Sequence, residues 1–169
     1  MKREMRRIKQ LLPEDKTIEI MERNTAGVLA LLDDDDYPYA VPVSYVYAAE
    51  AEGEGKVYVH SAKEGHKVDA VRNHGKASFC VIDKDQIVPE EYTTYFRSAV
   101  AFGKVRLVED GEEKKKAIEL LGRKYYPADT AENLARVIEK ENEHFVVIAL
   151  DIEQLTGKEA IELVRAREK

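Results

Sequence analysis

Residues 27–47 carry the pattern that most restricts how this chain can fold. An apolar run is followed by four consecutive aspartates at 33–36 and then by the alternating run YPYAVPVSYVY. The alternation assigns its members to two faces, Tyr39, Val41, Val43, Tyr45 and Tyr47 on one and Ala40, Pro42, Ser44 and Val46 on the other. Successive side chains of a strand point to opposite faces, so a period of two predicts a β-strand. The two runs therefore predict a β-hairpin with an acidic turn.

Four further runs have strand character. They are KVYVH (56–60), GKASFCVID (75–83), RSAVAFGKVRLVED (97–110) and EHFVVIALDIEQL (143–155). Gly103, in the middle of the longest run, suits the bulge that a bending sheet needs. Helical patterns occur at 12–24, 61–73, 111–127, 130–142 and 159–169, and Thr130 is in position to cap the fourth of them.

The order of these elements indicates the fold class. One helix follows the third strand and two follow the fifth, whereas a parallel sheet needs a helix after nearly every strand. Six mostly hairpin-linked strands predict a mainly β protein of the α+β type, an antiparallel β-barrel with peripheral helices. A chain of 169 residues suits a single domain over residues 1–169.

Composition excludes several classes of function. The formal net charge is −6, and the one dense basic stretch is KREMRR at 2–7, so no nucleic-acid partner is expected. No apolar run approaches the ~20 residues of a membrane-spanning helix, and no apolar core follows the basic start, so neither a membrane span nor a secretory signal is expected. The lone Cys80 cannot form an internal disulfide and is expected in the core of a cytoplasmic protein.

Two other groups of residues are weaker candidates for a site. The aspartates at 33–36 resemble a trap for a divalent cation, but carboxylates at a hairpin tip are usually solvated. The histidines at 60, 66, 74 and 144 show no metal-ligand spacing, and we predict no metal site. Tyr92 and Tyr95 are candidates for the mouth of a substrate site.

The stretch KVYVHSAKEGHKVDAVRN, residues 56–73, joins a strand end to a helix start. Ser61 is in position to cap the helix, which would leave the amides around 63–65 facing outward. A helix amino end carries partial positive charge, and Lys63, His66 and Lys67 add donors, so this corner is predicted to bind a phosphate. A capped surface helix with solvated lysines remains the alternative on these residues alone.

Two residues on the neighbouring hairpin favour a bound ligand. Pro42 interrupts a strand and has no N–H to donate, which suggests a sheet edge, a bulge or a ligand lying against the backbone. Ser44 shares its face. A flat aromatic ligand could lie along residues 42–45 while its phosphate reaches residues 60–67.

Four segments together resemble a known family. They are YPYAVPVSYVY, KVYVHSAKEGHKVDAVRNHGKASF, YFRSAVAFGKVRLVED and LDIEQLTGKEA, and HSAKEGHK is the most specific motif. The chain resembles the FMN-binding split-barrel proteins related to pyridoxamine 5'-phosphate oxidase, and among them the nitroimidazole-resistance (Nim-type) reductases. The resemblance implies a six-stranded antiparallel split β-barrel and a homodimer that binds two FMN molecules in clefts between its subunits.

The resemblance also implies which residues bind the cofactor. Pro42, Val43 and Ser44 match the strand along the isoalloxazine ring, and His60, Ser61 and Ala62 match the strand end beside the ribityl chain. His66 and Lys67 match the basic pair that holds the FMN phosphate, and Arg97 and Ser98 match a polar position that contacts the cofactor.

The implied function is FMN-dependent reduction of a small electron-poor compound, of nitroimidazole or nitroaromatic type, by a nicotinamide donor. Because the flavin carries out the chemistry, no catalytic side chain is expected. The alternative is a non-catalytic protein that binds flavin, haem or deazaflavin on the same barrel. Pyridoxamine oxidation is not expected, because the chain ends in LTGKEAIELVRAREK rather than in the segment that holds the vitamin phosphate.

Overall fold

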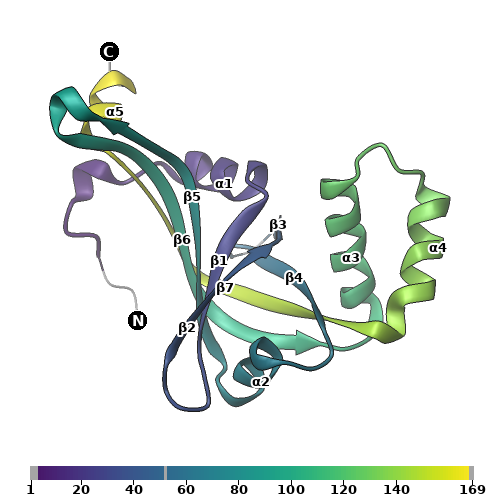
Figure 1. Ribbon diagram of the computed structural model, residues 1–169. Helices are drawn as coiled ribbons and strands as arrows, with labels where there is room; N and C mark the ends of the chain where they lie inside the picture. Colours follow the sequence, from purple (N-terminus) through teal and green to yellow (C-terminus); the bar gives the residue numbers. More distant parts are fainter. Residues whose placement is uncertain (1–3, 52, 168–169) are drawn as a thin grey trace.

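The computed structural model describes residues 4–51 and 53–167, arranged as Figure 1 shows. Within these residues the strands are β1 (Ala26–Leu32), β2 (Pro38–Ser44), β3 (Val46–Ala48), β4 (Lys56–Ala62), β5 (Lys76–Val88), β6 (Thr93–Val108) and β7 (Phe145–Glu159). The helices are α1 (Glu14–Arg23), α2 (His66–Asn73), α3 (Gly111–Tyr125), α4 (Ala131–Glu141) and α5 (Ile161–Arg167), with 3-10 turns η1 (Ile8–Gln10), η2 (Pro89–Glu91) and η3 (Asn142–His144). All five predicted helices are present, and residues 168–169 of the last one lie outside the described part.

The strands form one antiparallel sheet in the order β2-β1-β5-β6-β7-β4-β3. Its two edge strands, β2 and β3, are consecutive in the chain, and only Tyr45 separates them. Residues 38–48 therefore begin at one edge of the sheet and end at the other, which curls the sheet into a barrel. The predicted fold class is confirmed, with seven strands among the described residues rather than six because Tyr45 divides the predicted second strand.

At this crossing from β2 to β3, a side chain of α3 makes the backbone hydrogen bonds that a neighbouring strand would otherwise make. The hydroxyl of Tyr125, at the end of α3, accepts from the Tyr45 N–H at 2.8 Å and lies 2.9 Å from the Tyr45 carbonyl oxygen. The Tyr45 side chain is fully buried, and its hydroxyl donates to the Met21 carbonyl of α1 at 2.8 Å. Lys124 lies 4.3 Å from the centre of the Tyr45 ring, and burial lowers the pKa of this lysine. One residue thus connects the barrel to α1 and α3.

Two apolar clusters stabilise the fold. The larger fills the barrel and includes residues of α1 and α2, which pack on the strands at the two ends of the barrel (Figure 1). The smaller lies outside the barrel, where α3 packs on the sheet; its members are Val46, Tyr58, Val108, Ala117, Leu121, Val147 and Ala149. In Figure 1, α3 and α4 form a helical hairpin on this side of the molecule.

The predicted alternation along β2 is confirmed. Tyr39, Val41 and Val43 pack against the barrel core, whereas Ala40, Pro42 and Ser44 are exposed. Residues paired across neighbouring strands share a face of the sheet, so the strand registers extend the exposed face of β2 across β1, β5, β6 and β7. We call it the outer face, and its members are Ala26, Val28, Ala30, Ala40, Pro42, Ser44, Ser78, Cys80, Ile82, Ser98, Val100, Phe102, Gln154, Thr156 and Lys158.

Cys80 belongs to this outer face, so its predicted place in the core is wrong. Its neighbours Phe79 and Val81 are fully buried, and the period of two turns the Cys80 side chain to the outside, where it is half-buried. Burial raises the pKa of its thiol.

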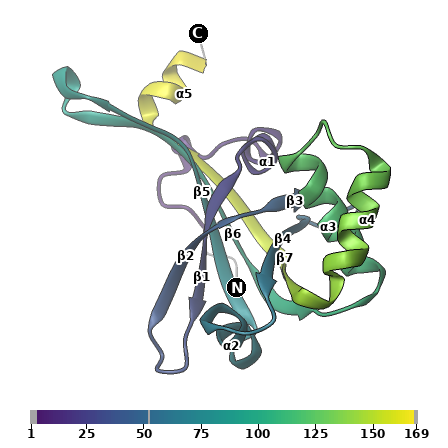
Figure 2. The same cartoon turned by 45° about the vertical axis from the view of Figure 1, so that its right-hand side comes forward.

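Beyond Ile82, β5 and β6 continue as an arm that leaves the barrel, at the upper left of Figure 1. The predicted strands ended at 83 and began at 97, so the sequence analysis missed this arm, residues 84–96. A register shift between Ile82 and Lys84 marks its base. Tyr92, at its tip, adopts a left-handed conformation with φ 51° and is 98% exposed. Figure 2 shows α5 beside the arm from a second direction.

Two local predictions are confirmed. The register of β6 and β7 shifts at Gly103, and an added Cβ there would lie 2.1 Å from the Asp151 carbonyl oxygen, so this close approach requires glycine. Thr130 caps α4, because its hydroxyl accepts from the Asn133 N–H at 3.1 Å. In the part of the chain that the structure describes, no helix is both long and apolar enough to cross a membrane.

We expect Tyr125→Phe to lower the free energy of unfolding by about 1 to 3 kcal/mol, because it leaves the buried N–H of Tyr45 without its acceptor. Urea denaturation followed by circular dichroism measures this loss. Tyr126→Phe is the matched control, since Tyr126 is the next residue and is exposed. Equal stability of the two variants would show that the crossing does not depend on this hydrogen bond.

Candidate functional site

The junction between β4 and α2 differs from the prediction in one respect. β4 continues to Ala62, and Ser61 lies within it, paired with Val146 and buried. The N-cap of α2 is Gly65, with φ 124° and no side-chain cap. The predicted Ser61 cap is therefore wrong, because the alternation of β4 turns the Ser61 side chain toward the barrel interior before the helix begins.

The start of α2 nevertheless presents unpaired donors. The Val68 and Asp69 N–H groups bond to the Gly65 carbonyl at 2.8 and 3.1 Å, whereas the N–H groups before them have no acceptor within the helix. The space beside Gly65 is open, since an added Cβ there would meet nothing within 4 Å. Lys67 is half-buried, and His66 is exposed. Helix-start amides, a lysine and a histidine form a donor set that fits a phosphate.

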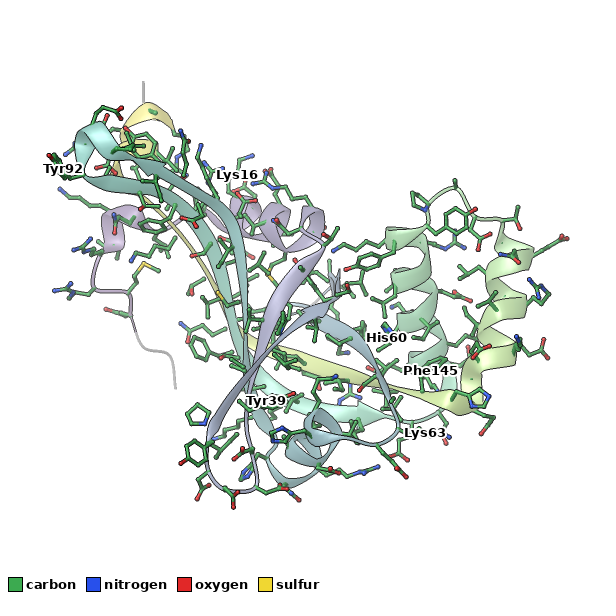
Figure 3. All side chains as sticks on the ribbon, in the orientation of Figure 1. Lys16, Tyr39, His60, Lys63, Tyr92 and Phe145 are labelled. Atoms are coloured by element: carbon green, nitrogen blue, oxygen red, sulfur yellow. The ribbon has the colours of Figure 1, made fainter. Side chains whose placement is uncertain are left out.

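Four predicted site residues lie on β2 and β4 where these two strands separate, a region that we call the split. The register that pairs β3 with β4, if continued along β2, would set Ser44 opposite His60 and Pro42 opposite Ala62. β2 pairs with β1 instead, so β2 and β4 diverge (Figure 1). All four side chains are exposed. Figure 3 shows His60 on the part of β4 that leads to Lys63 and α2.

Two other predicted residues, Val43 and Ser61, point into the barrel instead. Val43 packs against the core, and Ser61 is 7% exposed. Only their backbone groups can face a ligand in the split.

A contact that the sequence analysis missed joins the acidic turn to α2. Oδ2 of Asp33 lies 3.5 Å from Nε2 of His66, and the Tyr39 ring stacks on the His66 ring with centres 4.1 Å apart. Asn73, in the last turn of α2, donates to Asp34. No local pattern of residues indicates this contact, because it depends on the barrel bringing the β1–β2 turn and α2 to the same end.

Within one chain, Arg97 and Ser98 do not join the split. They lie on β6 where the arm begins, near α5, whereas α2 lies at the opposite end of the barrel in Figures 1 and 2. Nε and Nη2 of Arg97 lie 3.1 and 3.0 Å from Oε2 of Glu159, which is fully buried. The guanidinium therefore neutralises a carboxylate inside the protein.

Asp83 extends this ion pair to α1. Arg23 donates from Nε and Nη2 to Asp83 at 2.8 and 2.5 Å, and Asn24 donates at 3.0 Å. Burial tends to raise the pKa of Asp83, but the hydrogen bonds from Arg23 and Asn24 and the charge of Arg97 lower it below its ordinary value. The base of the arm is thus bound to the barrel by charge.

A cavity of about 330 Å³ lies between α2, the start of α3 and η3, apart from the split. Lys114 in its wall is 2% exposed, and its Nζ donates to the Asn142 carbonyl at 2.6 Å. Burial, followed by the nearby Lys63 charge, lowers the pKa of Lys114. The lining carries both signs of charge, Lys63, Arg72 and Lys114 against Glu109, Asp110 and Glu143, so it does not favour an anion.

The remaining candidates lie elsewhere. Tyr92 and Tyr95 are on the arm, where the Tyr95 hydroxyl donates to Glu91 at 2.8 Å, and their role at a substrate mouth stays a prediction. Among the described residues, no group of three or more His, Cys, Asp or Glu side chains could hold a metal ion.

The fold and the split define a class of protein: a split β-barrel with a set of hydrogen-bond donors where β4 meets α2. The family profile described as pyridoxamine 5'-phosphate oxidase matches residues 13–159, and the chain belongs to this family. No curated protein matches it.

Solved structures share the fold at low sequence identity. A proposed 5-nitroimidazole antibiotic resistance protein from Bacteroides thetaiotaomicron is 23% identical, with a TM-score of 0.67 over 88% of this chain and 85% of that one. The flavocytochrome Anf3 from Azotobacter vinelandii is 19% identical, with a TM-score of 0.75 over 93% and 72%. The FAD and haem binding protein from Mycobacterium smegmatis is 17% identical, with a TM-score of 0.66 over 95% and 80%.

We expect Arg97→Met to lower the free energy of unfolding by about 3 kcal/mol, because it removes the main partner of a fully buried carboxylate. Chemical denaturation without added cofactor measures the loss. Arg165→Met, at an exposed arginine of α5, is the control for the same change of side chain. Wild-type stability of the Arg97 variant would contradict a structural role for this ion pair.

Proposed function

We propose that the protein binds FMN at the split and uses it to reduce small electron-poor compounds, of nitroimidazole or nitroaromatic type, with electrons from a nicotinamide donor. The observation that carries the proposal is the donor set at the start of α2, directly after the strand that borders the split. FMN has a phosphate at one end and a flat ring at the other, and a helix start next to two diverging strand edges suits both parts.

Each part of the site has a role in this proposal. The first amides of α2, together with His66 and Lys67, bind the phosphate. The exposed edges of β2 and β4, at 42–44 and 60–62, lie along the ring and the ribityl chain. FMN supplies the group that accepts and passes on hydride, so the chain needs no nucleophile of its own. The Ser44 hydroxyl or a neighbouring amide donates toward the ring and favours a negative charge on it.

The relatives support the choice of chemistry. One similar structure is named for 5-nitroimidazole resistance, which supports a nitro compound as the electron acceptor. Two others are named a flavocytochrome and an FAD and haem binding protein. Those names favour a second candidate, a protein that binds flavin or haem without turnover, and the reduction experiment below separates the two.

We further propose that the working form is a cytoplasmic homodimer. The side chains at the split are exposed, whereas ligand sites usually bury 70–90% of their ligand, so one chain covers FMN incompletely. Apart from Gln154, Thr156 and Lys158, the outer face carries apolar or small side chains, and on it Phe102 is 51% and Ile82 64% exposed. Such a surface suits a second copy, whose arm could bring Arg97 and Ser98 to the cofactor. A lone cysteine is typical of a reducing compartment.

We expect Lys67→Ala to weaken FMN binding by about 1 to 3 kcal/mol, or roughly 5- to 150-fold in Kd, because it removes a charged partner of the phosphate. Quenching of flavin fluorescence on titration measures Kd. Arg72→Ala is the matched control, since Arg72 is a cation on the same helix but contacts Asp69 at 3.6 Å and Glu109 at 3.8 Å. Equal FMN affinity of the two variants would reject the phosphate site.

Adding a nicotinamide donor to the FMN-bound protein then distinguishes a reductase from a protein that binds the flavin without turnover. NADH or NADPH, added without oxygen, should bleach the flavin absorbance, and a nitroimidazole should restore it. Absorbance that no donor changes would support the non-catalytic binder. Pyridoxamine 5'-phosphate is tested in the same way, and we expect the protein not to oxidise it.

We expect Phe102→Asp to convert the dimer into monomers and to weaken FMN retention, because it places a charge on the outer face at a side chain that is 51% exposed. Sedimentation equilibrium gives the mass, and flavin absorbance gives the bound cofactor. Val137→Asp on α4, where the side chain is 41% exposed, is the control. A Phe102 variant that remains dimeric would place the interface elsewhere.

A further inference from the structure

The β1–β2 turn holds one residue of the proposed phosphate site from two sides. The Tyr39 and His66 rings are nearly parallel, at 16°, with centres 4.1 Å apart. Nε2 of His66 lies 3.5 Å from Oδ2 of Asp33, whose side chain is only 17% exposed. The ring plane and the direction of one ring nitrogen are therefore both defined by the hairpin, although the His66 side chain itself is 52% exposed.

Asp33 is itself fixed within the turn. Its Oδ1 accepts from the Asp35 N–H at 3.0 Å and from the Tyr37 N–H at 2.7 Å, which leaves Oδ2 for the imidazole. The contact between Asn73 and Asp34 ties the same turn to the other end of α2. A histidine held by such a turn loses less side-chain freedom when it binds a ligand.

The position of this turn raises an electrostatic conflict. Four aspartates at 33–36 lie beside a site proposed to bind a dianion, and like charges at this range repel. By charge alone, each aspartate would weaken phosphate binding. Asp33 differs from the others in that its carboxylate contacts His66, so it can strengthen phosphate binding through that ring.

We infer that Asp33 and Tyr39 are positioning residues for the FMN phosphate, an inference that rests on the proposed function. Nε2 of His66 faces Asp33, so Nδ1 is the ring nitrogen left to donate to the phosphate, next to the first amides of α2. The acidic turn thus orders a ring donor of the proposed phosphate site, and this offsets part of the repulsion between the turn and the phosphate.

The test compares Asp33→Asn with Asp35→Asn, using FMN and riboflavin as probes at one pH and ionic strength. Asparagine keeps an acceptor oxygen for the Asp35 and Tyr37 N–H groups but presents no carboxylate to His66, so the turn is retained. We expect Asp33→Asn to weaken FMN binding about fivefold and to leave riboflavin binding unchanged. Asp35→Asn, which removes the same charge from an exposed position in the same turn, should leave FMN binding unchanged or tighten it slightly.

Two further variants distinguish positioning from a general loss of structure. Tyr39→Phe retains the stacked ring and should bind FMN like the wild type, whereas Tyr39→Leu should lose severalfold in affinity. In a His66→Ala background, Asp33→Asn should no longer weaken FMN binding, because the residue through which Asp33 acts is gone. Matching thermal unfolding curves confirm that the variants are folded.

The outcomes separate this inference from the proposed function. If the wild type binds FMN more tightly than riboflavin but Asp33→Asn binds FMN as tightly as Asp35→Asn does, the turn acts only by its charge and the inference alone is overturned. If the wild type binds the two flavins equally, the phosphate site and this inference both fail.

Discussion

The fold depends on closing a sheet whose two edge strands are neighbours in the chain. A single residue, Tyr45, separates β2 from β3, so its backbone cannot continue the hydrogen bonding of either strand. The Tyr125 hydroxyl takes over that role, and the Tyr45 side chain fills the barrel end against α1. Buried backbone groups without partners are costly, which makes this replacement a condition for the crossing. Because β3 pairs with β4 after the crossing whereas β2 pairs with β1 before it, the crossing also separates β2 from β4 and so creates the split.

Ion pairs hold the arm and α3, which lie outside the barrel, against it. Arg97 and Arg23 share the Asp83 carboxylate, and Arg97 also serves the buried Glu159, so the base of the arm is joined to α1. On the other side, Arg106 binds Glu113 of α3 at 2.7 Å and Asp151 of β7 at 2.7 Å. Exposed ion pairs contribute little by themselves, but these are shared, multidentate and partly buried. They fix how the arm and α3 are held on the barrel.

The sequence predicted those features that follow from local periodicity. The alternation along β2, the bulge at Gly103 and the cap at Thr130 each depend on a few neighbouring residues and were predicted correctly. The predicted cap at Ser61 and the predicted core position of Cys80 depend on residue type alone. In the structure the alternation of β4 turns Ser61 into the barrel, and the alternation of β5 turns Cys80 to the outer face.

The contacts that the sequence did not reveal join distant segments. Asp33 meets His66 across 33 positions and Arg97 meets Glu159 across 62, and only the closed barrel brings them together. The arm was missed because its polar residues, KDQ at 84–86, do not show the pattern of a half-buried strand, since no core lies beneath them.

Pro42 has a consequence beyond any ligand. β2 is an edge strand, and an exposed edge invites sheet extension by another chain, the usual beginning of aggregation. Proline within β2, with a second one at its first residue, Pro38, removes donors that an added strand would need. The split can therefore stay open to a small molecule without also acting as a template for β-addition.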